Sequence, residues 1–153
     1  MPFPQNMLDH ELIQRKVKLI QEDLSLLEPM ADYSFDQIAK DQTKYDAVER
    51  RLERIVTRAI DVNRHVIAEL GKGNESVRTY EDTFLRLVDL GVYPEKFAKE
   101  IAPSAGLRNI LVHEYDEVDP KLVFQSMGKA LFQYAKYCDY LLKLLAKGRK
   151  NES

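Results

Sequence analysis

The chain has 153 residues, 44% of them hydrophobic and 31% charged, and its 25 acidic and 23 basic residues leave a formal net charge of -2. This length suits a single domain with one core, and the composition argues against a disordered chain. The balanced charge excludes a global positive field of the kind that draws proteins to nucleic acid, so any basic surface has to be local.

Apolar residues in the first half of the chain recur at steps of three and four, which is typical of helices with one buried face. Ser34 and Gln37 resemble a capping box before the second of these segments, and Gly71 is a natural C-cap after the third. The predicted helices of this half cover residues 8–27, 35–41 and 44–70.

The second half of the chain continues the helical spacing, with Thr79 and Asp119 as N-caps and with Pro103 and Gly106 as interruptions. The predicted helices of this half cover residues 80–90, 94–101, a short segment that ends near His113 or Tyr115, and 120–147.

No segment alternates apolar and polar residues as a half-buried strand does. We therefore predict an all-α protein, an up-down four-helix bundle with short additional helices. Residues 1–153 are expected to form one domain, with a flexible arm at 1–7 and a flexible tail at 148–153.

The sequence also indicates a cellular compartment. No apolar run approaches the roughly 18 residues that a membrane span needs, and the N-terminus has no basic segment followed by an apolar one. The single cysteine, Cys138, lies in an apolar helical pattern and can form no disulfide within the chain. We expect a cytoplasmic protein with no membrane partner, in which Cys138 is a small core residue.

One stretch, residues 108–115, gathers arginine, asparagine, histidine and tyrosine around an apolar run, and we call it the polar octet. A histidine near neutral pH can take the proton of a ribose 2′-hydroxyl, and an arginine can stabilise the charge of the phosphorane-like transition state. Arg108 and His113 are therefore candidate catalytic residues for RNA cleavage without a metal or other cofactor.

An isolated Arg-x4-His pattern is weak, however, and alone it favours a structural interpretation. In that interpretation Arg108 pairs with an acid, Asn109 caps a helix and His113 donates to a carbonyl.

Geometry constrains the catalytic interpretation. On one ideal helix Arg108 and His113 point about 140° apart, whereas Asn109 and His113 share a face. Either the helix ends before His113, or a second copy of the chain completes the site across a two-fold axis.

Asp61 and His65 lie four residues apart on the third predicted helix. A metal site would need a third ligand, and no sequence motif supplies one, so a structural hydrogen bond between them is the favoured interpretation. Alternatively, the two side chains lie behind the polar octet and support its residues.

Arg50, Arg54 and Arg58 recur at every fourth residue and would form a basic row along one helix face. Such a row could contact RNA phosphates. Glu49 and Glu53 lie close to it, and they favour a solvated face with salt bridges instead.

The polar octet, Arg108-Asn109-x-x-x-His113 followed by Glu114-Tyr115, resembles the Arg-x4-6-His motif of the HepT family of minimal HEPN-domain proteins. Segments 48–50, 59–67 and 80–92 resemble the same family, and the likeness covers about residues 8–145. Members are ribonuclease toxins paired with MntA-type nucleotidyltransferase antitoxins.

The resemblance implies a HEPN bundle, a homodimer that brings both motifs together, and a metal-independent endoribonuclease of a type VII toxin-antitoxin system. It assigns Arg108 and His113 as the catalytic pair and Asn109 as the motif asparagine. It also implies that the antitoxin adds AMP to Tyr115, and that the substrate is an RNA, with transfer RNA as one candidate. Some HEPN proteins are inactive, so the alternative is a non-catalytic dimeric adaptor that binds a minimal nucleotidyltransferase.

Overall fold

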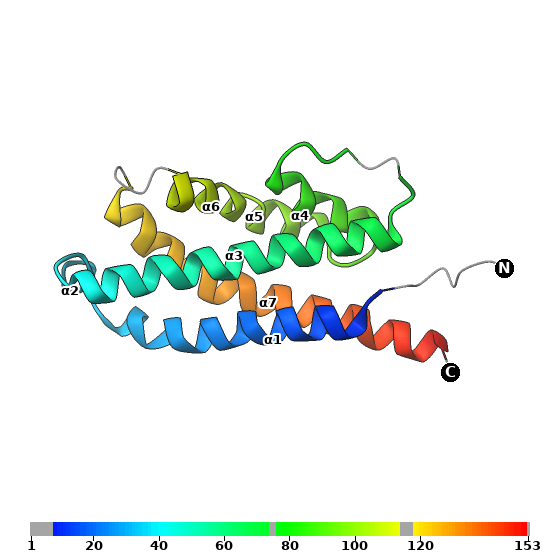
Figure 1. Cartoon of the computed structure of the whole chain (residues 1–153), viewed down its shortest axis with the longest axis horizontal. Helices are drawn as coiled ribbons and strands as arrows, with labels where there is room; N and C mark the ends of the chain where they lie inside the picture. Colours follow the sequence, from blue (N-terminus) through cyan, green and yellow to red (C-terminus); the bar gives the residue numbers. More distant parts are fainter. Residues whose placement is uncertain (1–7, 74–75, 114–117, 153) are drawn as a thin grey trace.

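Figure 1 shows the computed structural model of the chain, which describes residues 8–73, 76–113 and 118–152. Every regular element in these ranges is a helix. In chain order they are α1 (His10–Leu27), the 3-10 helix η1 (Glu28–Asp32), α2 (Phe35–Ala39), α3 (Gln42–Leu70), α4 (Tyr80–Asp89), α5 (Glu95–Ile101), α6 (Ser104–His113) and α7 (Pro120–Glu152). The predicted all-α class is confirmed. The predicted arm at 1–7 lies outside the described residues.

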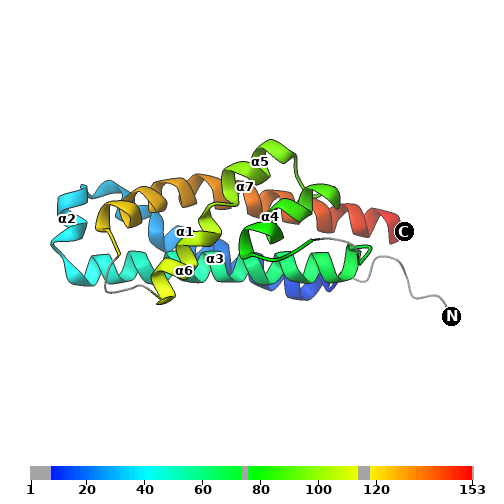
Figure 2. The ribbon, with the colours of Figure 1, turned by 90° about the horizontal axis from the view of Figure 1, so that it is seen from above.

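Three long helices, α1, α3 and α7, run along the length of the molecule, and α1 packs against both of the others. The fourth member of the bundle is broken into α4, α5 and α6, which lie on the side of α3 and α7 opposite α1 (Figure 1). Seen from above, α6 rests on α3 and ends toward the end of the bundle where α2 and the start of α7 lie (Figure 2). The polar octet therefore begins on a short helix supported by α3.

Local sequence signals set the helix boundaries. The Ser34–Gln37 and Thr79–Asp82 pairs both form capping boxes, in which each side chain accepts from the backbone N–H of the other residue. Gly91 follows α4 with a φ of 77°, a left-handed conformation that glycine adopts without strain. These boundaries lie close to the predicted ones because caps depend only on nearby residues.

Two boundaries differ from the prediction. Gly106 was expected to interrupt the chain but lies inside α6, where the buried neighbours Ala105 and Leu107 anchor the helix to the core. Pro103 directly precedes α6, a position where its missing N–H removes no helical hydrogen bond. The last helix runs to Glu152 instead of ending near residue 147, so it continues through most of the predicted tail.

The core is rich in aromatic residues. Tyr134, Tyr137 and Phe84 are fully buried, and their ring centroids lie 5.8–6.4 Å apart in edge-to-face or tilted pairs. Cys138 is buried among them, as predicted for a small core residue. None of the helices in the described ranges combines the length and apolar character needed to cross a bilayer.

Candidate functional site

Arg108 has an unusual set of partners for an arginine. Its Nε donates to Thr57 Oγ1 on α3 at 3.0 Å, and its Cζ lies 5.2 Å from the centre of the Tyr80 ring at the start of α4. Among the residues that the structure describes, no acidic side chain forms an ion pair with it. The hydroxyl and the ring orient the guanidinium without cancelling its charge, so it can still pair with an anion.

Asn109 is exposed on α6 and faces a hollow of about 470 Å³, which we call the arginine groove. Among the described residues that line it, Arg64 and Arg78 carry positive charge and none carries negative charge. The groove is lined by Arg64, Val77, Arg78, Thr79, Tyr80, Thr83 and Asn109. Tyr80 connects it to Arg108, because the same residue lines the groove and carries the guanidinium on its ring.

A buried hydrogen-bond network supports the groove. Thr83 Oγ1 donates to the Tyr80 carbonyl at 2.6 Å and accepts from Asn63 Nδ2 at 3.2 Å. The Tyr137 hydroxyl lies 2.6 Å from Asn63 Oδ1 and 3.1 Å from the Ala59 carbonyl. Burial raises the pKa of Tyr137 well above its ordinary value, so the phenol stays protonated and keeps its donor. The network joins α3, α4 and α7 beneath the groove and fixes its floor.

His113 is the last residue of α6, five positions after Arg108 on the same helix. The alternative in which the helix ends before His113 is therefore wrong. The two residues stand about 7.5 Å apart along the axis and about 140° apart around it. The side chain of His113, and all of Tyr115, lie outside the described part of the chain.

Asp61 and His65 do not bond to each other. Asp61 pairs with Lys16 on α1 at 3.5 Å, and His65 Nε2 accepts from the backbone N–H of Asp9 at 3.1 Å. Asp61 therefore contacts α1 and His65 contacts its N-cap residue, whereas Arg108 contacts α3 and α4. The structure does not bring the pair together with the polar octet.

The predicted row of Arg50, Arg54 and Arg58 is not one continuous basic surface. Arg58 is turned to the buried carboxylate of Asp23 on α1, which also accepts from Arg51 at 2.9 Å. Arg50 is exposed and contacts the glutamate three residues later at 3.6 Å. Arg50 thus agrees with the favoured solvated face, whereas Arg58 fastens α1 to α3, which that interpretation did not include.

Sequence reasoning missed Thr57, Arg64, Arg78 and Tyr80. Thr57 and Arg64 are seven residues apart, so they share one face of α3, and the capping box at Thr79 places Tyr80 in the first turn of α4. The helical spacing could have grouped Thr57 with Arg64, and the capping box could have grouped Arg78 with Tyr80. They could not have shown that Thr57 and Tyr80 meet at Arg108.

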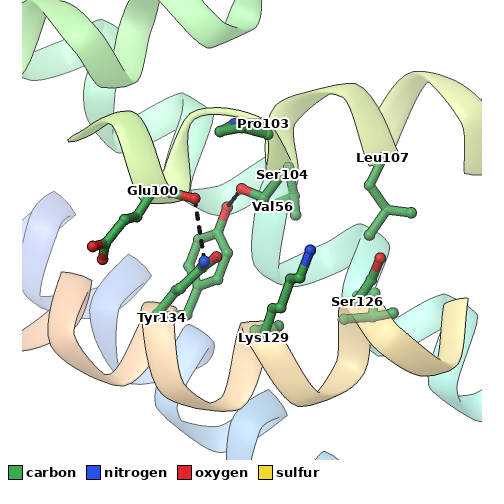
Figure 3. A pocket seen from close by; sticks show the side chains of 11 residues that line it. Val56, Glu100, Pro103, Ser104, Leu107, Ser126, Lys129 and Tyr134 are labelled. Carbon is green, nitrogen blue, oxygen red and sulfur yellow. Dashed lines mark hydrogen bonds between the residues drawn. The ribbon is translucent and has the colours of Figure 1, made fainter. Parts of the chain in front are cut away.

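A second hollow of about 260 Å³ lies between α6 and α7 (Figure 3). Ser104 and Tyr134 meet across it with hydroxyl oxygens 2.6 Å apart, and Leu107 and Val56 give it apolar walls. Lys129 reaches toward it from α7. Arg108 and Asn109 do not line this pocket, so the arginine groove is the hollow associated with Arg108.

Comparison with known proteins gives the family. A family model described as Ribonuclease HepT-like matches residues 20–141. A tRNA nuclease HepT of Aphanizomenon flos-aquae is 37% identical over 126 residues, covering 82% of this chain and 84% of that protein. An mRNA nuclease HepT of Shewanella oneidensis is 25% identical over 105 residues, covering 69% and 77%.

The solved structure of a tri-AMPylated Shewanella oneidensis HEPN toxin in complex with MNT antitoxin shares the fold. The TM-score is 0.75 at 22% identity, over 88% of this chain and 98% of that one. The bundle, the polar octet and the match over most of the chain agree, and the chain belongs to the HepT-like ribonuclease family.

Proposed function

We propose that this chain is a metal-independent endoribonuclease, the toxin of a HepT/MntA-type toxin-antitoxin pair that acts in the cytoplasm. The observation that carries the proposal is the state of Arg108, which Thr57 and Tyr80 orient while its charge stays unpaired among the described residues. The relatives named as tRNA and mRNA nucleases support RNA as the substrate class.

The reaction we propose is an intramolecular transfer. His113 takes the proton from a ribose 2′-hydroxyl, and that oxygen attacks the adjacent phosphorus. The bond from phosphorus to the 5′-oxygen breaks, and the leaving oxygen takes a proton, which gives a 5′-hydroxyl and a 2′,3′-cyclic phosphate. Arg108 stabilises the charge on the phosphorane-like transition state, and Asn109 positions the phosphate.

A homodimer would complete this site. Because α6 continues through His113, the positions of Arg108 and His113 lie about 140° apart around the helix axis in one copy. A two-fold axis beside α6 would place the histidine of one protomer next to the arginine of the other. The dimer is thus part of the mechanism that we propose.

Regulation would act through Tyr115, two residues after His113. We propose that an MntA-type nucleotidyltransferase adds AMP to its hydroxyl, which puts bulk and negative charge where RNA phosphates have to lie. The structural neighbour described as a tri-AMPylated toxin bound to an MNT antitoxin supports this assignment.

The test is cleavage of transfer RNA and messenger RNA by the purified protein in EDTA, with Arg108→Ala and His113→Ala as variants. We expect wild-type cleavage to survive EDTA and to leave 2′,3′-cyclic phosphate ends, and both variants to lose activity while remaining folded dimers. Cleavage that requires Mg²⁺ would overturn the mechanism, and full activity in both variants would overturn the site. A wild-type protein that binds the nucleotidyltransferase but never cleaves RNA would support the adaptor alternative.

A further inference from the structure

We propose that the arginine groove binds a phosphodiester of the RNA next to the scissile one, with Arg64 and Arg78 as its ligands. The identity of the ligand as RNA rests on the proposed function. The groove would hold the strand on one side of the cleavage point while Arg108 acts on the neighbouring phosphate. Arg64 and Arg78 are thus positioning residues for the substrate.

The charge of the groove is the first argument. Arg64 on α3 and Arg78 before α4 are both exposed, and within the described ranges neither forms an ion pair. Their guanidinium groups present several N–H donors, which suits phosphate oxygens. No acidic residue in the described part of the chain lines the groove, so this positive charge is local and agrees with a net charge of -2 for the whole chain.

The shape of the groove is the second argument. Its volume of about 470 Å³ falls within the range of small-ligand sites. Thr83 forms a rigid floor through its bonds to Asn63 and the Tyr80 carbonyl, so the backbone beneath a bound phosphate is fixed. Val77 is 41% exposed beside it and offers apolar contact to a sugar or an unstacked base. The combination fits an unpaired nucleotide better than a free ion.

Continuity with Arg108 is the third argument. Asn109, the next residue on α6, lines the groove, and the Tyr80 ring forms part of the groove while the Arg108 guanidinium lies over it. A strand whose phosphate meets Arg108 would therefore have its next phosphate beside the groove. The pocket between α6 and α7 does not offer such a path, because Arg108 and Asn109 do not line it and its walls are mainly apolar (Figure 3).

Binding of single-stranded RNA with 2′-O-methyl groups at every position tests the proposal, because this probe has no free 2′-hydroxyl to attack. Fluorescence anisotropy would compare wild type with Arg64→Ala/Arg78→Ala over a salt series. The matched control, Arg15→Ala/Lys18→Ala, removes two exposed charges from α1 on the opposite side of the bundle. Thermal melting would verify that both double variants are folded.

We expect the groove variant to bind at least tenfold more weakly than wild type at low salt, and the control variant to bind like wild type. The slope of log affinity against log salt should fall by about 0.7 for each lost contact, or about 1.4 in total. With cleavable RNA, the groove variant should raise KM more than it lowers kcat. Arg64→Lys, which keeps the charge, should retain more of the binding than Arg64→Ala.

Three results would separate the two proposals. If the groove variant binds the probe as the control does, the groove assignment is overturned even when wild type cleaves RNA. If only binding of the nucleotidyltransferase falls, the groove is a protein contact and the assignment is again overturned. If wild type does not cleave RNA but the groove variant loses probe binding, the groove assignment holds and the nuclease proposal fails.

Discussion

Two arginines of this bundle have opposite environments. Arg58 on α3 donates to Asp23, a carboxylate that is 3% exposed, and so its charge is matched inside the protein. Arg108 on α6 is held by a hydroxyl and an aromatic ring, which orient it but leave its charge unmatched within the described chain. The first arrangement stabilises the contact of α1 with α3, and the second prepares a cation for an external anion.

The difference shows why counting arginines along a helix face does not locate a phosphate site. Arg50, Arg54 and Arg58 have regular spacing, yet Arg58 pairs with the buried carboxylate of Asp23 and Arg50 pairs with a neighbouring glutamate. Arg64 and Arg78 have no regular spacing, yet they line one groove. Whether an arginine can bind a phosphate depends on whether it already has an acidic partner, and such partners come from distant parts of the sequence.

The largest expected effect is on the rate of RNA cleavage, which should depend on Arg108 and not on Arg58. Arg108→Ala should reduce single-turnover RNA cleavage by about 10²–10³, the typical cost of losing one donor to a developing negative charge. Arg58→Ala should leave the cleavage rate of the folded protein unchanged, because Arg58 contacts Asp23 and not the groove. Rates would be measured at saturating protein, with melting curves for both variants. Equal losses of activity would contradict this division of roles.

The next effect concerns stability. Asp23→Ala would leave Arg51 and Arg58 without their carboxylate and should cost about 2–3 kcal/mol of unfolding free energy. That cost corresponds to a fall in Tm of roughly 5–10 °C for a domain of this size. The matched control is Asp36→Ala on α2, an exposed aspartate, which should change Tm far less. A fall in Tm no larger than that of the control would show that the buried cluster does not hold α1 to α3.

Much of the fold could be predicted because its signals are local. The capping boxes at Ser34 and Thr79 involve residues three positions apart, and the structure contains both. Gly106 was misjudged because the roughly 1 kcal/mol cost of a helical glycine is small beside the burial of Ala105 and Leu107. Tertiary packing, which a local pattern does not contain, decided that boundary.

The candidate site was less accessible to sequence reasoning. The polar octet identifies Arg108 and Asn109, but the partner of Arg108, Thr57, lies 51 positions earlier in the chain. Asp61 and His65 have suitable spacing for a pair, yet the first pairs with a lysine of α1 and the second bonds to the N-cap residue of that helix. Spacing on one helix fixes which residues share a face, but it does not fix which helix covers that face.

A smaller effect on kcat is expected from Thr57, the residue that orients Arg108. Thr57→Val removes the hydroxyl that accepts from Nε and keeps nearly the same shape, so we expect about a fivefold to tenfold loss in kcat. Thr57→Ser keeps the hydroxyl and should restore most of the rate, which a purely structural role for the methyl group would not explain. KM should change little. Thr43→Val, an exposed substitution in the first turn of α3, is the control.

The smallest effect is a dependence on pH. The backbone N–H groups of Arg78 and Thr79 lower the pKa of Asp82 below 3.8, so its cap stabilises α4 above that pH and loses this contribution as pH falls through the folded pKa. Asp82→Asn should therefore melt below wild type at pH 7, and the gap should shrink as the solution is acidified.

Asp41 provides a matched comparison, because its cap on α3 also has a lowered pKa, mainly through the Lys44 side chain. Asp41→Asn should show a similar gap in Tm that closes at low pH. Only Asp82→Asn should also slow RNA cleavage at neutral pH, because Asp82 caps the turn that carries Tyr80 beneath Arg108. If both variants cleave at the wild-type rate, the start of α4 does not position the guanidinium, and Thr57 alone sets its orientation.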